Sequence, residues 1–385
     1  MQHKGKLNIG IIGGVAIMLA LTLAVATAAY RTHHNEDDSE IFFKAYPQTS
    51  GTRLDGCDVC HSRVMAPPIG QQGGQTVSRN ACDSCHLLTD YGRKKADVLT
   101  PFGRDYMKNG RNAAAFSVIA KLDSDGDGAT NADELAAMTD PGDPQSAPNK
   151  MEAAHVIISY DDLLKKQIPV REQAMFANVT KSRDGDSYSD LSGFRLIEVL
   201  EAAGIAKDAK SIDVISADGY VITFSIEQLR KSWPQSAPVF GLGTETLGEC
   251  GWVRYGAKNL REGTPLPPAD ILLAFAENGE NYQPASISAD GRINGNGPLR
   301  VVAPQMMSPG IPDISINATQ ACIQKVDEKY RYHRDYEKNA DYCVKAVVAI
   351  RVNPMPEDVM DINWQKYTKQ AIAEKSVVIF GALNR

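Results

Sequence analysis

The sequence is poor in the residues and patterns that many catalytic and nucleic-acid-binding sites use. It holds only seven cysteines and seven histidines among 385 residues. Its net charge is -6, so it lacks the basic excess that is typical of proteins that bind nucleic acid. It contains no Ser-His-Asp arrangement, no Cys-His pair of the protease type and no phosphate-binding P-loop. These absences argue against nucleic-acid binding and against the commonest hydrolases and nucleotide-dependent enzymes.

One long apolar run stands near the N-terminus. Residues 7–29 carry no charge, and they follow a short basic start that contains Lys4 and Lys6. The run is long enough to span a bilayer, and it ends in the small residues Ala26-Thr27-Ala28, which are typical of a cleavage site. We therefore expect residues 1–30 to be a cleaved signal peptide or a retained inner-membrane anchor. The remainder of the chain is then exported, as in a periplasm.

Four of the cysteines form two Cys-x-x-Cys-His patterns within residues 57–86, separated by twenty residues. This spacing is typical of c-type haem attachment, because two thiols a short turn apart can each bond one vinyl group of the same porphyrin. The histidine that follows is then placed under the iron as the proximal ligand. The attachment residues predicted for two covalently bound haem c groups are Cys57, Cys60, His61, Cys82, Cys85 and His86.

The alternatives for this segment are a zinc site and a pair of redox dithiols. Zinc binding would not require a histidine at the same place after both cysteine pairs, so the haem interpretation is favoured. Haem iron in electron carriers also takes a sixth ligand, usually His or Met. We expect His33 or His34 at one iron and His155 or Met107 at the other.

A second metal signal is the acidic run at residues 123–134, Asp-Ser-Asp-Gly-Asp-Gly-Ala-Thr-Asn-Ala-Asp-Glu. It matches the twelve-residue calcium loop of EF-hand proteins, in which oxygen ligands stand at positions 1, 3, 5, 7, 9 and 12 and glycine at position 6. Gly128 occupies that glycine position. Since only one such loop is present, we expect a structural Ca²⁺ rather than a sensor. The predicted ligands are Asp123, Asp125, Asp127, the Ala129 carbonyl, Asn131 and Glu134.

The composition and the predicted secondary structure of the chain change after this loop. Residues 144–150 are rich in proline and polar residues and are expected to link a dihaem domain (31–143) to a second domain (151–385). In the second domain we predict a helix over 193–203, a hairpin from 212–216 and 220–224, and strands over 271–275, 299–303, 346–352 and 376–380. The expected fold class is α+β, with a small mostly helical haem domain followed by a mixed or largely antiparallel sheet.

Three cysteines remain after the haem motifs are assigned. In an oxidising compartment two of them can pair. We expect Cys322 with Cys343, because these two flank one polar excursion of the chain, while pairings of Cys250 with either one stay open.

Parts of the second domain resemble the molybdopterin-binding domain of the sulfite oxidase superfamily. The resemblance lies in residues 194–200, in Ala203-Gly204, in 216–220 and in 297–302, and it covers roughly residues 155–352. In that superfamily a cysteine thiolate before the matching helix holds molybdenum. The corresponding segment here, residues 174–181, has no cysteine. We therefore expect the fold without the molybdenum cofactor.

The whole arrangement is similar to the dihaem cytochromes named for a GEGP motif, which join an exported dihaem segment to a domain of this kind. The matching residues here are Gly295-Asn296-Gly297-Pro298, with Asn in place of Glu. The sequence thus favours an electron-transfer protein that meets redox partner proteins and has an accessory docking domain. The alternative is a haem-linked molybdopterin oxidoreductase of the sulfite oxidase type.

Overall fold

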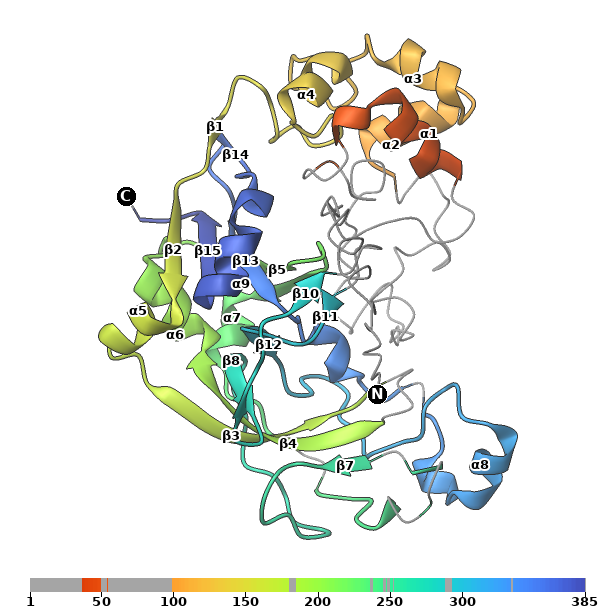
Figure 1. Cartoon of the computed structure of the whole chain (residues 1–385), viewed down its shortest axis with the longest axis vertical. Coiled ribbons are helices and arrows are strands. Elements are labelled where there is room, and N and C mark those ends of the chain that lie inside the picture. Colours follow the sequence, from red (N-terminus) through yellow and green to blue (C-terminus); the bar gives the residue numbers. More distant parts are fainter. Residues whose placement is uncertain are drawn as a thin grey trace, which may run out of the picture.

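The computed structural model describes residues 37–49, 54, 99–179, 185–235, 238–244, 247, 250–251, 253–287, 293–333 and 335–384. Figure 1 shows the described helices that precede residue 150 gathered at one end of the molecule and the sheets occupying the rest. This part of the chain is a mixed α+β structure with several sheets and few helices, which confirms the predicted class at that level.

The first unit, residues 37–49 with 99–150, is helical. It contains α1 (Asp37–Ala45), α2 (Pro101–Lys108), α3 (Ala113–Ile119) and α4 (Asn131–Ala137). Thr100, Asn112 and Thr130 begin α2, α3 and α4, and each side chain accepts a hydrogen bond from a backbone N–H of the first turn. Aromatic rings fill the core between the helices, where Tyr106 and Phe116 stack with their centroids 4.2 Å apart. The helices are short, so this core holds the unit together.

The larger sheet lies in the second unit, residues 151–384. Its described strands follow the order β12-β8-β4-β3, with β7 beside β4 and β9 beside β8. They are β3 (Val170–Ala177), β4 (Asp186–Arg195), β7 (Val253–Tyr255), β8 (Leu272–Glu277), β9 (Glu280–Asn281) and β12 (Arg300–Val302). Every pair is antiparallel except β4 with β7. Gly193 lets β4 approach β8, since a Cβ there would lie 2.7 Å from the Ala274 Cα.

The second sheet has the order β2-β15-β13-β5-β6 among the residues described. Its strands are β2 (His155–Ser159), β5 (Ser211–Ser216), β6 (Val221–Ser225), β13 (Val347–Asn353) and β15 (Ser376–Gly381). β13 and β15 are parallel and the other pairs are antiparallel. The predicted hairpin is confirmed as β5–β6. The other predicted strands are confirmed as β8, β12, β13 and β15, with small shifts at their ends.

The main apolar core lies where the two sheets meet. It combines Phe194 and Leu273 of the larger sheet with Val214 and Ile350 of the smaller one. The helices around the sheets are α5 (Tyr160–Lys165), α6 (Leu196–Ala203), α7 (Ile226–Arg230), α8 (Gln320–Lys325) and α9 (Thr368–Glu374). The short pairs β1 (Met151–Glu152) with β14 (Val359–Met360), and β10 (Ser286–Ile287) with β11 (Ile293–Asn294), complete the unit.

The disulfide differs from the predicted pairing. Cys250 is bonded to Cys322 at the start of α8, with an S–S distance of 2.03 Å, and Cys343 is a buried free thiol. The expectation of Cys322 with Cys343 was therefore wrong. The Cys343 Sγ instead lies 3.4 Å from the Asn339 carbonyl and packs with Met175 and Val302 on the larger sheet. Tertiary packing thus decides which of the three cysteines meet.

The described helices give no membrane span, since none of them is both long and apolar enough to cross a bilayer. The predicted signal peptide or anchor at residues 7–29 lies outside the described residues.

Candidate metal centre

Most predicted haem residues fall outside the described part of the chain. The two attachment motifs, with Cys57, Cys60, His61, Cys82, Cys85 and His86, and the distal candidates His33 and His34 belong there. Their haem assignment stays a prediction.

The two described distal candidates lie in different units. Met107 is half-buried on α2 of the helical unit. His155 is exposed on the edge strand β2, where its Nε2 lies 3.1 Å from the Tyr367 hydroxyl. Neither residue has another ligand candidate of the predicted set beside it among the described residues. Their role at iron therefore stays a prediction.

The acidic loop lies between α3 and α4. One carboxylate oxygen from each of Asp123, Asp125 and Asp127 lies within 4.8 Å of the other two. Asp123 accepts hydrogen bonds from the backbone N–H groups of Gly126 (2.7 Å) and Gly128 (3.0 Å). The loop therefore turns around the Asp123 carboxylate and directs acidic side chains at alternate positions toward one another.

Gly128 has the conformation that the predicted loop requires. Its φ is +98°, and Gly126 has a φ of +83°, values that side chains with a Cβ rarely adopt. Asp127 Oδ1 then accepts a hydrogen bond of 2.7 Å from the Ala129 N–H. The glycine that the motif places at position 6 is therefore a conformational requirement of this loop.

Four carboxylate oxygens of the loop are buried without a hydrogen-bond partner. They are Asp125 Oδ2, Asp127 Oδ2 and both oxygens of Glu134. Glu134 is fully buried, with an exposed fraction of 0%. A buried polar group without a partner costs about 1–3 kcal/mol, and more when it carries charge. Unpartnered carboxylate oxygens in one loop are groups that a bound cation would stabilise.

The electrostatics of the loop agree with its geometry. Burial, followed by the charges of Asp125 and Asp127, raises the pKa of Glu134 to about 9. Burial and the charge of Asp127 raise the pKa of Asp125 to about 6. Burial and the mutual repulsion of the carboxylates both favour the protonated form. A divalent cation bound among these carboxylates would lower their pKa values. Ligand sets made only of oxygen atoms favour Ca²⁺ or Mg²⁺.

Asn131, the predicted ligand at position 9, is bonded within the loop. It is fully buried, and its Nδ2 donates to the Ile119 carbonyl (2.7 Å) and to Ser124 Oγ (2.9 Å). Its Oδ1 accepts from the Ser124 N–H at 3.2 Å. The amide therefore holds the start of the loop against the end of α3. The structure brings Asp123, Asp125 and Asp127 together, while Glu134, Asn131 and the Ala129 carbonyl stay predicted ligands.

The loop is also hydrogen-bonded to α2. Ser124 Oγ donates to Asp105 Oδ2 on that helix at 2.8 Å. The N-cap of α2, Thr100, contacts the turn after α4, where a Cβ on Gly142 would lie 2.7 Å from the Thr100 Cβ. The start and the middle of α2 are thus held by residues of the loop or of the turn that follows it. Since α2 follows the segment with the two Cys-x-x-Cys-His motifs, the loop lies close in the chain to the predicted haem residues.

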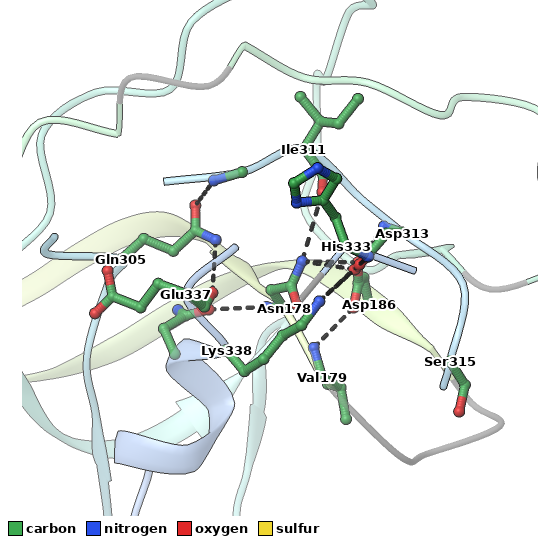
Figure 2. Close-up of polar contacts among 12 residues, drawn as sticks. Asn178, Val179, Asp186, Gln305, Ile311, Asp313, Ser315, His333, Glu337 and Lys338 are labelled. Carbon is green, nitrogen blue, oxygen red and sulfur yellow. Dashed lines mark hydrogen bonds and ion pairs between the residues drawn. The ribbon is translucent and has the colours of Figure 1, made fainter. Parts of the chain in front are cut away.

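Sequence reasoning missed a second polar centre, in the sheet unit (Figure 2). Asp186 at the start of β4 and Asp313 are both fully buried. Lys338 Nζ lies 2.7 Å from each oxygen of Asp313, and Asn178 Nδ2 lies 3.0 Å from Asp313 Oδ1 and 3.3 Å from Asp186 Oδ2. Burial and the charge of Asp313 raise the pKa of Asp186 well above its usual value. We name these four residues the lysine cluster.

A neighbouring carboxylate stabilises the loop beside this cluster. Glu337 Oε2 accepts hydrogen bonds from the backbone N–H groups of Met306 (2.7 Å), Met307 (2.6 Å) and Ser308 (3.2 Å). Gln305 Nε2 donates to the Glu337 carbonyl at 2.9 Å. Glu337 and Lys338 are therefore buried and hydrogen-bonded inside the fold, although the sequence places them in a polar excursion.

One residue of the lysine cluster lies in the segment (174–181) where the resemblance would place a molybdenum ligand. Asn178 belongs to that segment, and its amide is engaged with Asp186 and Asp313. Among the described cysteines, Cys250 and Cys322 form a disulfide. The Cys343 thiol packs against Met175 of that segment, but it lies 3.4 Å from the Asn339 carbonyl, and burial raises its pKa, which disfavours the thiolate. The four side chains of the lysine cluster offer only oxygen and nitrogen atoms, which do not make a soft-metal ligand set.

No protein-family model, curated protein or solved structure matches this chain.

Proposed function

We propose that the chain is an exported dihaem c-type cytochrome that transfers electrons, with a calcium-stabilised helical unit and an accessory sheet domain that docks a redox partner. The observation that carries the proposal is the pair of Cys-x-x-Cys-His motifs within thirty residues. Each motif supplies both thioether sulfurs and a proximal ligand for one haem. The short interval between the motifs places the two haems near one another along the chain, where they can exchange electrons.

Two described features support this proposal. The disulfide between Cys250 and Cys322 is typical of a protein that folds in an oxidising compartment, which is also where c-type haem is attached. The unpartnered oxygens of Asp125, Asp127 and Glu134 support an EF-hand-like calcium site in the unit that contains the haem segment. Calcium would neutralise the loop and so hold α2, through Asp105, against the rest of that unit.

The enzyme alternative lacks a specific observation in its favour. A molybdopterin oxidoreductase of the sulfite oxidase type would require a thiolate in the segment that Asn178 occupies. The sheet domain is therefore assigned to docking and to positioning of the haem segment, with a sulfite-oxidase-like fold inferred from the sequence pattern alone.

The test is metal content and visible spectroscopy on protein matured in a periplasm. We expect two iron atoms and one calcium per chain, no molybdenum, and low-spin haem spectra. Replacement of Asp125 by Ala should lower the melting temperature in calcium and leave it unchanged in excess chelator. Molybdenum at one atom per chain, or iron that is absent after maturation, would overturn the proposal.

A further inference from the structure

The turn at residues 295–298, to which the proposed function gives no role, is packed between two other segments of the sheet domain. Carbonyl groups of the turn accept hydrogen bonds from the backbone N–H groups of Ala285 (2.9 Å) and Ala346 (2.8 Å). A Cβ on Gly297 would lie 2.5 Å from the Cβ of Tyr282, so the turn also fits closely against that residue. The strand β12 begins directly after this turn, between the same two segments.

Two cationic residues are neighbours beside the turn. Val301 of β12 and Val344 form an antiparallel bridge and exchange two backbone hydrogen bonds of 2.9 Å. The next residues outward from such a pair also lie beside each other, which places Arg300 next to Lys345. Both valines face the core between the two sheets, so Arg300 and Lys345 belong to the opposite face of the larger sheet. Like charges in neighbouring cross-strand positions repel, and a bound anion would relieve that repulsion.

The Arg300 guanidinium is largely buried and incompletely hydrogen-bonded. Its side chain is 16% exposed, and its Nε is buried without a hydrogen-bond partner. Its Nη1 lies 3.6 Å from Glu277 Oε2, which is an ion pair but too long for a hydrogen bond. A guanidinium presents its N–H donors as a planar fork that matches the oxygens of a carboxylate or a phosphate. Arg300 is therefore suited to accept a further oxyanion.

Hydroxyl groups occupy both oxygens of the one carboxylate that is ion-paired with Arg300. Glu277 Oε1 accepts a hydrogen bond from Ser189 Oγ at 2.7 Å, and Oε2 accepts from the Tyr282 hydroxyl at 3.1 Å. These bonds orient the carboxylate and leave it at ion-pair distance from the guanidinium. Glu277 thus holds Arg300 in position without saturating its donors.

Lys345 is open to solvent beside the buried arginine. Its side chain is exposed, so a small ion can reach it without rearrangement of the fold. Burial, followed by the charge of Arg300, lowers the pKa of Lys345, whereas the charge of Asp218 acts in the opposite direction. The effect of Arg300 agrees with the cross-strand placement of the two cations.

We propose that Arg300 and Lys345 bind a small oxyanion, a carboxylate or phosphate group, on the face of the larger sheet that is opposite the core between the sheets. The anion would accept charge-assisted hydrogen bonds from the guanidinium and the ammonium. The turn at 295–298 positions this site, because it packs against Tyr282 and bonds the residue after Lys345. The site requires neither haem nor calcium, so it adds a binding activity to the proposed electron transfer.

The experiment is a calorimetric titration of the full-length protein with inorganic phosphate and, separately, with acetate, at constant ionic strength. The wild type should bind at least one of them, and the tighter of the two identifies the class of anion. Lys345→Gln should bind that anion about tenfold more weakly, because one charge-assisted hydrogen bond is lost. The matched control is Lys207→Gln, at an exposed position in the turn after α6, and it should stay within about twofold of the wild type.

A second variant distinguishes a binding site from a purely structural ion pair. Glu277→Gln removes the competing negative charge and keeps the shape of the side chain, so the anion should bind about threefold or more tightly than to the wild type. A structural pair would lose stability in this variant without any gain in anion affinity. Without added anion, Lys345→Gln should melt at the same temperature as the wild type or higher, because a repulsive charge has been removed.

The proposal fails on any of four results. A wild type that binds neither phosphate nor acetate would overturn the site. Equal anion affinity of Lys345→Gln and the Lys207 control would also overturn it. Anion affinity of Glu277→Gln that is unchanged or weaker would show that Arg300 is not a ligand. A lower melting temperature of Lys345→Gln without added anion would show that the lysine is structural.

Discussion

Replacement of Lys338 by Met should destabilise the sheet domain by about 3–5 kcal/mol, the usual cost of removing one partner of a buried ion pair. The ammonium lies 2.7 Å from both oxygens of Asp313, and Asp186 is held beside them by Asn178. The Lys338 and Asp313 side chains are 4% and 0% exposed, so water cannot replace the lost ammonium. Two buried carboxyl groups would remain without a cation.

The loss should grow with pH. A carboxyl group with a raised pKa in the folded state binds its proton more tightly there than in the unfolded chain. Stability therefore falls as pH rises from the unfolded pKa, about 4 for Asp, toward the folded pKa. Burial and Asp313 already raise the pKa of Asp186, and loss of Lys338 raises the pKa of both carboxyl groups further. Lys338→Met should thus lose more stability near about pH 8 than near about pH 5.

The assay is denaturant unfolding followed by tryptophan fluorescence at both pH values. All three tryptophans, at 233, 252 and 364, belong to the sheet domain, so the signal reports on that domain. Lys366→Met is the matched control, because its 3.2 Å contact with Glu152 joins side chains that are 53% and 36% exposed. That control should cost less than about 1 kcal/mol. A loss for Lys338→Met that equals the control, or that is the same at both pH values, would refute the reasoning.

Three further predictions concern other parts of the chain. Cys60→Ala should remove one of two haems in a pyridine haemochrome titration, and an unchanged count would contradict the attachment motif. Cys250→Ser should lower the free energy of unfolding by about 4 kcal/mol, because the disulfide closes a loop of 72 residues; Cys343→Ser should leave that disulfide intact in non-reducing mass mapping. Burial alone would raise the pKa of Asp213, but the Arg351 guanidinium at 2.7 Å outweighs burial and lowers this pKa. The ion pair therefore stabilises the fold above about pH 4, and this stabilisation is lost as pH falls through the lowered pKa. Arg351→Met should therefore cost about 3 kcal/mol near neutral pH and less in acid, as urea unfolding at the two pH values would show.

The sequence predicted the elements whose signal is local. The β-branched and aromatic runs at 212–216 and 220–224, on either side of Asp218-Gly219, indicated the β5–β6 hairpin. The predicted helix at 193–203 begins later, at Leu196, because Gly193 to Arg195 pair with β8. The loop glycine was predictable for the same local reason, since the motif requires its conformation.

Features that join distant residues were not predictable. The lysine cluster combines Asn178, Asp186, Asp313 and Lys338, and no spacing along the chain indicates that these positions meet. A single charged residue in a polar stretch, such as Lys338, gives the same sequence signal whether it is buried or solvated. The disulfide was mispredicted because Cys322 and Cys343 flank one polar excursion of the chain, whereas the fold brings Cys250 to Cys322. Asn131 was assigned by motif position, and only the structure shows its amide bonded within the loop.

The disulfide has a consequence for how the protein is made. A chain that carries c-type haem must keep its motif thiols reduced until the porphyrin vinyl groups have reacted, while Cys250 and Cys322 must be oxidised. Thioether formation adds a thiol to a vinyl group and consumes no oxidant, whereas a disulfide requires a two-electron oxidant, which could also oxidise the motif thiols before haem reaches them. If the chain is exported as proposed, the motif cysteines emerge first, and Cys250 and Cys322 follow more than 160 residues later. Haem ligation can therefore precede oxidation in time, and the third late cysteine, Cys343, is removed from exchange by burial once the sheet domain has folded.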